Sequence, residues 1–312
     1  MATSEAAARR AGFLFTAPAL ALMGVILLFP ILIATVLSFT NYSLGNSGFD
    51  WVGFQNYERI FTRSKFEKML WATGIYVAVV VPASLALGLG AALLITSVRH
   101  FGDFYKTIYF LPVMAALLAM AIVWEFALHP TIGLVNEMLE AGCRITPLRL
   151  WPWYDHGCAE GFPLWLGDKR YALGVVCFVG IWQAFGFNMV LYLAGLTSIP
   201  RELYHAAEMD GARTAWDRFR LVTWPMLGPT TVFVITITAI RSFQVFDIVE
   251  AFYPQGAGPS RSAFVAMFAI YETGVKQNLV GLGASITVVF LAFIMVLTLI
   301  LQRGVERRVH YA

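Results

Sequence analysis

Six long apolar stretches constrain this chain more than any other feature. A helix that crosses a bilayer needs about 20 mostly apolar residues, and six segments meet that length: residues 13–39, 70–95, 107–128, 172–196, 229–248 and 279–301. Composition agrees, because 59% of the 312 residues are hydrophobic and 13% are charged, which is about half the charge of a soluble domain. We predict one all-α membrane domain over residues 1–312 with six transmembrane helices.

The same composition excludes several classes of protein. A soluble globular domain, a disordered chain and a secreted disulfide scaffold all need more polar or more cysteine-rich sequences. The net charge of +3 is spread thinly, without the basic stripe that nucleic acid requires. We therefore expect membrane lipid, and no nucleic acid, among the partners.

Lys and Arg in the loops set the expected topology. With the N-terminus inside, eleven of these residues fall in cytoplasmic segments and ten in outer loops, which are longer in sum. The density of basic residues therefore favours cytoplasmic N- and C-termini. Loop 129–171 is then extracytoplasmic and loop 197–228 cytoplasmic.

Cys143 and Cys158 lie 15 residues apart in loop 129–171. Outside the cytoplasm they can form a disulfide that contributes about 3 kcal/mol. The alternative is a pair of unbonded thiols, and the sequence leaves both open.

Motifs for catalysis are missing from the sequence. None of the five lysines completes the Gly-Lys-Ser/Thr of a phosphate-binding loop, and the His and Cys residues lack the spacing of a zinc site. We predict no catalytic residues, no metal and no cofactor in this chain, which is therefore not an enzyme. Transport against a gradient would draw on an ion or on another subunit.

Loop 197–228 carries the strongest local signals. Ser198 is expected to cap a helix whose first turn holds Pro200 and Glu202, and Gly211 is expected to end it. Thr214 then caps a second helix.

The second helix of the loop is expected to stop near Pro225. Small residues Ala206 and Ala207 would allow another surface to approach this helix-Gly-helix unit closely. The alternative is an amphipathic helix that lies on the lipid surface.

The segment His-Ala-Ala-Glu-Met-Asp-Gly-Ala, residues 205–212, with Pro225 14 residues after Gly211, closely resembles the EAA loop of ABC-importer permeases of the maltose and glycerol-3-phosphate type. Four further segments resemble that family in the same order along the chain, namely residues 51–57, 110–112 with Trp124, 193–200 and 243–247. The resemblance implies the type I importer permease fold, located in the cytoplasmic (inner) membrane.

In that family the loop forms coupling helices that dock into an ATPase subunit. The residues implied to couple to the ATPase are Glu202, His205, Ala206, Ala207, Glu208, Asp210, Gly211 and Pro225. The implied partners are a second permease subunit, two ATPase subunits that bind ATP and Mg, and an extracytoplasmic solute-binding protein. The implied substrate is a carbohydrate.

His205 departs from the family pattern, which usually has Glu at this position. An imidazole that is neutral or partly protonated would weaken a salt bridge to the ATPase. Glu202 and Glu208 are the nearby carboxylates that remain.

Polar groups inside spans are costly and therefore mark functional candidates. The candidates for the substrate path are Trp182, Gln183 and Asn188 in the fourth span and Arg241, Gln244 and Asp247 in the fifth. On one continuous helix, Arg241, Gln244 and Asp247 would share a face. The alternative is that these groups pair with each other or with a second subunit, and that Trp182 packs in the core.

The function predicted from the sequence is half of the translocation path of a binding-protein-dependent importer for a di- or oligosaccharide. A phosphorylated polyol such as glycerol 3-phosphate is the second choice, because Arg241 can pair with an anion. An ion-coupled secondary transporter would need more acidic residues at the membrane midplane than the spans contain.

Overall fold

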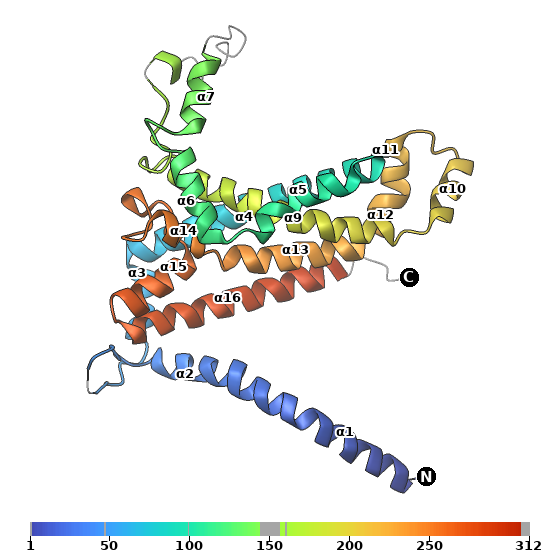
Figure 1. Ribbon diagram of the computed structural model, residues 1–312. Coiled ribbons are helices and arrows are strands. Elements are labelled where there is room, and N and C mark those ends of the chain that lie inside the picture. The colour runs from blue at the N-terminus through green and yellow to red at the C-terminus, as the bar shows by residue number, and fades with distance from the viewer. Residues whose placement is uncertain (1, 47, 99, 144–156, 160, 307–312) are drawn as a thin grey trace. The chain divides into compact units, whose positions relative to one another are not determined.

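The computed structural model describes residues 2–46, 48–98, 100–143, 157–159 and 161–306. The elements are α1 (Ala2–Met23), the π-helix η1 (Gly24–Leu28), α2 (Phe29–Leu37), α3 (Gln55–Thr62), α4 (Ser64–Ser97), α5 (Gly102–Met114), α6 (Leu117–Ala127), α7 (Leu134–Gly142), α9 (Ala172–Thr197), α10 (Arg201–Met209), α11 (Ala215–Arg218), the π-helix η3 (Phe219–Thr223), α12 (Trp224–Met226), α13 (Gly228–Phe243), α14 (Asp247–Phe252), the 3-10 turn η4 (Pro259–Arg261), α15 (Ala266–Tyr271), the π-helix η5 (Glu272–Lys276) and α16 (Val280–Glu306) (Figure 1).

The apolar stretches form membrane-length helices, as predicted. Five helical segments are long and apolar enough to cross a bilayer, namely Ala11–Leu37, Ser64–Ser97, Ala172–Thr197, Gly228–Phe252 and Val280–Ile300. A sixth span results if the bent pair α5 and α6 counts as one. In the described residues the β-structure is limited to one isolated bridge between Thr40 and Trp51, so the all-α membrane fold is confirmed.

The third span is not the single helix expected over residues 107–128. Its two halves, α5 and α6, are bent by 100°, because Ala115 and Ala116 have extended backbone angles. No Gly or Pro occupies this break; Pro112 lies three residues earlier, inside α5.

The chain divides into two compact units. The first comprises Met1–Ser64 with Ala269–Phe293. In this unit the segment after the first span folds back, and the buried Asn56 amide donates hydrogen bonds to the carbonyls of Ser38 and Thr40, at 2.9 and 2.8 Å. The side chain of Asn56 therefore fixes α3 against the end of α2.

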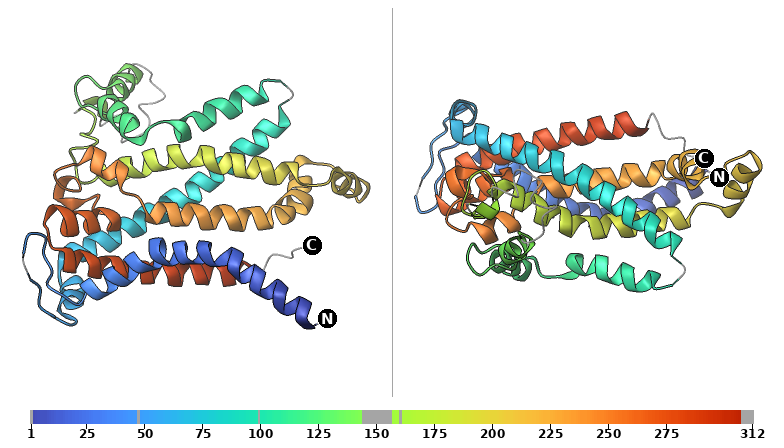
Figure 2. Two further views of the ribbon diagram at one scale, coloured as in Figure 1. Left: turned by 60° about the horizontal axis from the view of Figure 1, so that its bottom comes forward. Right: turned by 90° about the horizontal axis from the view of Figure 1, so that it is seen from above.

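The second unit comprises Lys65–Phe268 with Ile294–Ala312 and holds the candidate site. Within it, α9 contacts both α5 and α13, and the views in Figure 2 show α9 and α13 running alongside each other. Gly88 of α4 permits a close approach to α9, since a Cβ atom there would lie 2.8 Å from the Cβ of Asn188.

Candidate translocation cavity and coupling loop

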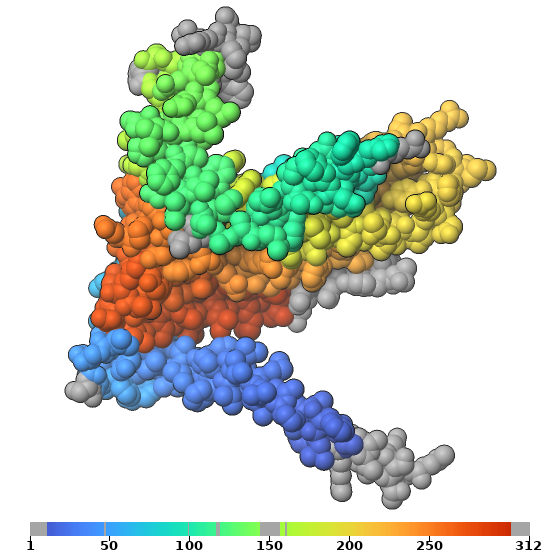
Figure 3. Space-filling model, in the orientation of Figure 1, coloured from blue at the N-terminus to red at the C-terminus, as the bar shows by residue number. Residues whose placement is uncertain are grey.

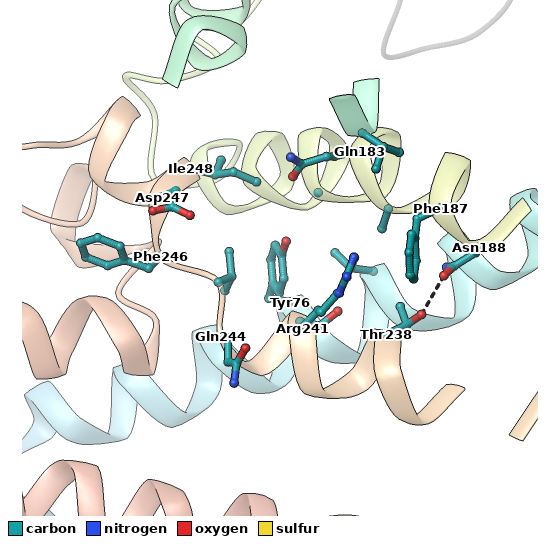
Figure 4. Close-up of a pocket in the computed structure, with 16 residues that line it drawn as sticks. Tyr76, Gln183, Phe187, Asn188, Thr238, Arg241, Gln244, Phe246, Asp247 and Ile248 are labelled. Carbon is teal, nitrogen blue, oxygen red and sulfur yellow. Dashed lines mark hydrogen bonds between the residues drawn. The ribbon is translucent and has the colours of Figure 1, made fainter. Parts of the chain in front are cut away.

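A cavity of about 330 Å³ lies between the spans of the second unit. Its walls come from α4, α5, α9, α13 and α14 (Figure 4). Polar lining residues are Tyr76, Gln183, Asn188, Thr238, Arg241, Ser242, Gln244 and Asp247. The volume is at the lower end of the range for small-molecule sites.

The helix of the fifth span is interrupted where it lines the cavity. Helix α13 ends at Phe243, and α14 begins at Asp247 after a turn at Gln244–Phe246. The expectation that Arg241 and Asp247 share a face of one continuous helix is therefore wrong. The cavity nevertheless brings both side chains together with Gln244, because the turn itself forms part of its wall.

Of the six predicted path residues, Trp182 is the one outside the cavity lining. Its ring packs edge to face on Trp124 of α6, with the ring centroids 5.5 Å apart. Trp182 thus helps to hold α6 against α9, which is the packing role that the sequence left open for it.

Asn188 lies at the cavity wall, but its side-chain amide is already hydrogen-bonded to neighbouring side chains. Its Nδ2 donates to Ser84 Oγ at 3.2 Å. Its Oδ1 accepts from Thr238 Oγ1 at 2.8 Å, the bond drawn as a dashed line in Figure 4. Ser84, Asn188 and Thr238 are all buried. This chain of hydrogen bonds joins α4, α9 and α13 and satisfies polar groups that lipid cannot.

Phe187 and Tyr76 are among the lining residues that were not predicted from the sequence. Phe187 of α9 lies 4.1 Å from the guanidinium carbon of Arg241, measured to the ring centroid. The second residue, Tyr76 of α4, is buried in the wall opposite Gly180. A polar hydroxyl in an apolar span is a signal that would have included Tyr76 among the candidates, whereas nothing distinguishes Phe187 among 25 phenylalanines.

Loop 197–228 projects beyond the ends of α9 and α13 (Figure 3). Gly211 terminates helix α10 as predicted: the last helical residue is Met209, and Gly211 follows the C-cap Asp210 with φ at +95°. The Ala212 N–H donates to the Ala207 carbonyl at 2.9 Å, and the Gly211 N–H donates to the Glu208 carbonyl at 3.2 Å. This pair of bonds is a Schellman motif, which requires the left-handed conformation that glycine adopts most easily.

The start of α10 differs from the prediction. Ser198 does not cap it, because its hydroxyl donates to the Gly195 carbonyl at 2.7 Å and so belongs to the end of α9. Pro200 immediately precedes α10, with no side-chain cap. The Gly195 carbonyl, which also accepts the Ser198 N–H at 3.3 Å, takes up the hydroxyl that would have capped α10.

Thr214 caps α11, as predicted. Its hydroxyl accepts from the Asp217 N–H at 3.1 Å, and the Asp217 carboxylate accepts from the Thr214 N–H at 2.9 Å. Hydrogen bonds from the Thr214 side chain, and then from its backbone, hold the pKa of the Asp217 carboxyl below its usual value. The reciprocal capping box fixes the turn between α10 and α11.

The second helix of the loop stops near Pro225, as predicted. A π-helical turn, Phe219–Thr223, leads directly into α12, which ends at Met226, one residue after Pro225. Pro225 itself lies in the first turn of α12, where a proline needs no N–H partner.

Charged side chains of the loop interact with each other. Arg218 Nη1 lies 3.0 Å from Glu208 Oε1, and His205 Nδ1 lies 3.9 Å from Glu208 Oε2. All three side chains are more than two-fifths exposed, so these pairs contribute little to stability. Glu208 is consequently shared between two basic groups of its own chain.

The two alanines predicted to meet another surface have different environments. Ala206 is exposed, whereas Ala207 is buried against the rest of the loop. Ala206 can therefore meet another surface, and the expectation that Ala207 also does so is wrong. Next to Ala206, the Met209 side chain is 89% exposed.

One buried apolar cluster connects this loop to the spans. Its loop members are Ala207, Ala212 and Val222, and its members at or within the spans and their junctions are Ala92, Ile95, Met189, Tyr192, Leu193, Ile199, Leu227 and Val234. The hydroxyls of Tyr204 and Thr223 add a hydrogen bond of 3.1 Å between α10 and η3. Close packing of this kind transmits displacement, because interiors are poorly compressible.

The loop predicted to be extracytoplasmic contains a disulfide between Cys143 and Cys158, with the Cα atoms 5.8 Å apart. Residues 144–156 between them lie outside the described residues. In the same loop, Trp165 Nε1 donates to Asn136 Oδ1 at 2.7 Å and so connects Trp165 to α7. Figure 1 shows α7 and α10 at opposite ends of the second unit.

Comparisons with known proteins agree with this geometry. The family model of the binding-protein-dependent transport system inner membrane component matches residues 84–311. The lactose transport system permease protein LacF of Rhizobium radiobacter is 32% identical over 263 residues, covering 84% of this chain and 82% of its own. The sulfoquinovosyl glycerol transport system permease protein SmoG of Agrobacterium fabrum is 30% identical over 297 residues, covering 95% and 90%.

A solved structure shows the fold. A chain of a bacterial ABC transporter involved in the import of the acidic polysaccharide alginate superposes with a TM-score of 0.77 at 20% identity, covering 96% of both chains. The fold is therefore that of an ABC importer permease.

Proposed function

The chain belongs to the family of inner membrane components of binding-protein-dependent transport systems, and on that premise we propose that it is one permease subunit of an ATP-driven sugar importer. It forms half of the path for a di- or oligosaccharide and performs no chemistry itself. Relatives named for the transport of lactose and of sulfoquinovosyl glycerol support a carbohydrate as the transported substrate.

The cavity suits a sugar. Amides of Gln183 and Gln244 and the hydroxyl of Tyr76 offer donors and acceptors for sugar hydroxyls. Phe187 and Ile248 give the same cavity apolar surface against which ring carbons can pack.

The observation that carries the proposal is the buried cluster between loop 197–228 and the helices around the cavity. ATP with Mg binds to a pair of separate ATPase subunits, whose closure pulls on α10. Because Ala207 and Val222 pack in one cluster with residues of α4, α9 and α13, that pull reaches the cavity walls and opens the path to the other side.

The proposal places loop 197–228 and both termini in the cytoplasm. The loop that contains the Cys143–Cys158 disulfide then lies outside, in a compartment that permits disulfides. There a solute-binding protein delivers the sugar, and a second permease subunit completes the cavity.

Purification of the tagged chain in mild detergent from its native membrane tests this assignment. Mass spectrometry should identify a phosphate-binding-loop ATPase and a second permease in the same sample, and that sample should hydrolyse ATP. A chain that purifies alone or as a homo-oligomer without ATPase activity would instead favour ion-coupled transport.

A further inference from the structure

Arg241 occupies a distinctive place in the cavity. It belongs to the last turn of α13, and its guanidinium carbon lies 4.1 Å from the centroid of the Phe187 ring on α9. Figure 4 shows the side chain reaching from α13 toward α9, between Tyr76 and Phe187. The ring holds the cation by a cation–π contact and so restricts where its N–H donors lie.

No carboxylate of the described residues pairs with this cation. The ion pairs found there join other residues, and the acidic residue of the cavity, Asp247, lies beyond the turn Gln244–Phe246. A charged group within a span needs a counter-charge, water or a ligand. The guanidinium of Arg241 is therefore available to whatever enters the cavity.

The chemistry of the Arg241 guanidinium limits the classes of ligand that it can bind. A guanidinium presents a planar fork of N–H groups that matches two oxygens of a carboxylate, sulfonate or phosphate, and such charge-assisted bonds are about twice as strong as neutral ones. The neighbouring groups Tyr76, Gln183 and Gln244 are neutral and suit hydroxyls. Asp247 can accept hydrogen bonds from hydroxyls at its own end of the cavity.

We propose that Arg241 makes this importer prefer sugars that carry an acidic group over their neutral counterparts. Phe187 is the residue that positions its guanidinium. This inference rests on the proposed sugar-importer function and specifies the substrate class of the same cavity.

The test uses the purified complex with all its subunits in lipid nanodiscs, without the binding protein, so that the permease alone selects the ligand. Two radiolabelled probes, cellobiose and cellobiouronate, differ only in the carboxylate. Equilibrium dialysis should show that the complex binds cellobiouronate at least about tenfold more tightly. The preference should decrease as salt is added.

Two variants assign the preference to one residue. Arg241→Gln should bring the affinity ratio of the two probes close to one, mainly through weaker binding of cellobiouronate. Arg261→Gln is the matched control, because Arg261 also contacts a ring, Phe264 at 5.0 Å, but lies outside the cavity lining. The control should keep the full preference.

Several results would overturn the inference. Equal binding of the two probes by the unmodified complex would do so, as would binding of neither. If Arg241→Gln releases the second permease on size-exclusion chromatography, the residue serves the subunit interface instead. A chain that purifies without ATPase refutes the proposed function, whereas an intact ATP-hydrolysing complex without acid preference refutes this inference alone.

Discussion

Asn188 is a polar residue inside a span that we expect to stabilise the helix packing rather than to bind a substrate. Both ends of its amide are occupied, by Ser84 and by Thr238. We expect Asn188→Ala to lower the free energy of unfolding by about 1 to 3 kcal/mol, since two buried hydroxyls lose a partner, and to leave the uptake KM unchanged. Thermal unfolding in detergent and uptake into proteoliposomes measure the two effects.

The matched control for Asn188 is Thr238→Val, which removes the same hydrogen bond from the other side. The double variant should cost less than the sum of the single variants, because both act on one bonded chain. A raised uptake KM with unchanged stability would instead assign Asn188 to substrate binding.

Gly211 is the residue on which the geometry of loop 197–228 depends. Its φ of +95° disfavours residues with a Cβ by roughly 1 to 2 kcal/mol, and β-branched residues most of all. We expect Gly211→Val to abolish uptake while the assembled complex still hydrolyses ATP. Uptake and ATPase rates measured on the same proteoliposomes check this.

Asparagine provides the control at position 211, because it tolerates the left-handed conformation better than other non-glycine residues. Gly211→Asn should retain most of the uptake. Normal uptake by Gly211→Val would show that the Schellman turn is not needed for coupling.

At the scale of elements, the turn between α10 and α11 depends on pH through the capping box. The pKa of Asp217 is lowered in the folded loop, so its contribution is complete above the pKa of the unfolded chain and is lost as pH falls through the folded pKa. Hydrogen exchange at the Asp217 amide, corrected for the intrinsic rate, should therefore accelerate in acid. Asp217→Asn should remove this pH dependence, and an unchanged dependence in that variant would contradict the assignment.

The elements also show which local signals in the sequence were sufficient. Gly211 and Thr214 were predicted correctly because each acts on its own few residues of backbone. The helix stop near Pro225 was also predicted correctly. The cap expected from Ser198 is wrong because the outcome depends on its neighbours: its hydroxyl bonds to a carbonyl at the end of α9.

At the scale of the whole molecule, the spans follow from hydropathy, whereas their interruptions do not. The third span breaks at Ala115 and Ala116, and the fifth at the turn Gln244–Phe246. Neither break contains a Gly or Pro that would signal it in the sequence. Such breaks are stable in a membrane only where other helices or a cavity satisfy the freed backbone groups. That condition depends on tertiary packing, which a single sequence does not reveal.

Several residues of the cavity were predicted from the sequence, but their contacts with each other were not. Five of the six predicted path residues line it, because a costly polar group in a span is visible in the sequence. The pairing of Arg241 with Phe187 required the structure, since it joins α13 to α9 across 54 residues of chain.

The central claim is that loop 197–228 meets an ATPase in the cytoplasm rather than the lipid surface. A photoreactive amino acid in place of Met209, which is 89% exposed on α10, tests this contact directly in native membranes. A second variant carries the same group at Leu164, which is 53% exposed in the loop predicted to lie outside. We expect Met209 to cross-link to the ATPase subunit and Leu164 not to do so. Cross-links from Met209 to lipid alone, or from Leu164 to the ATPase, would contradict the account.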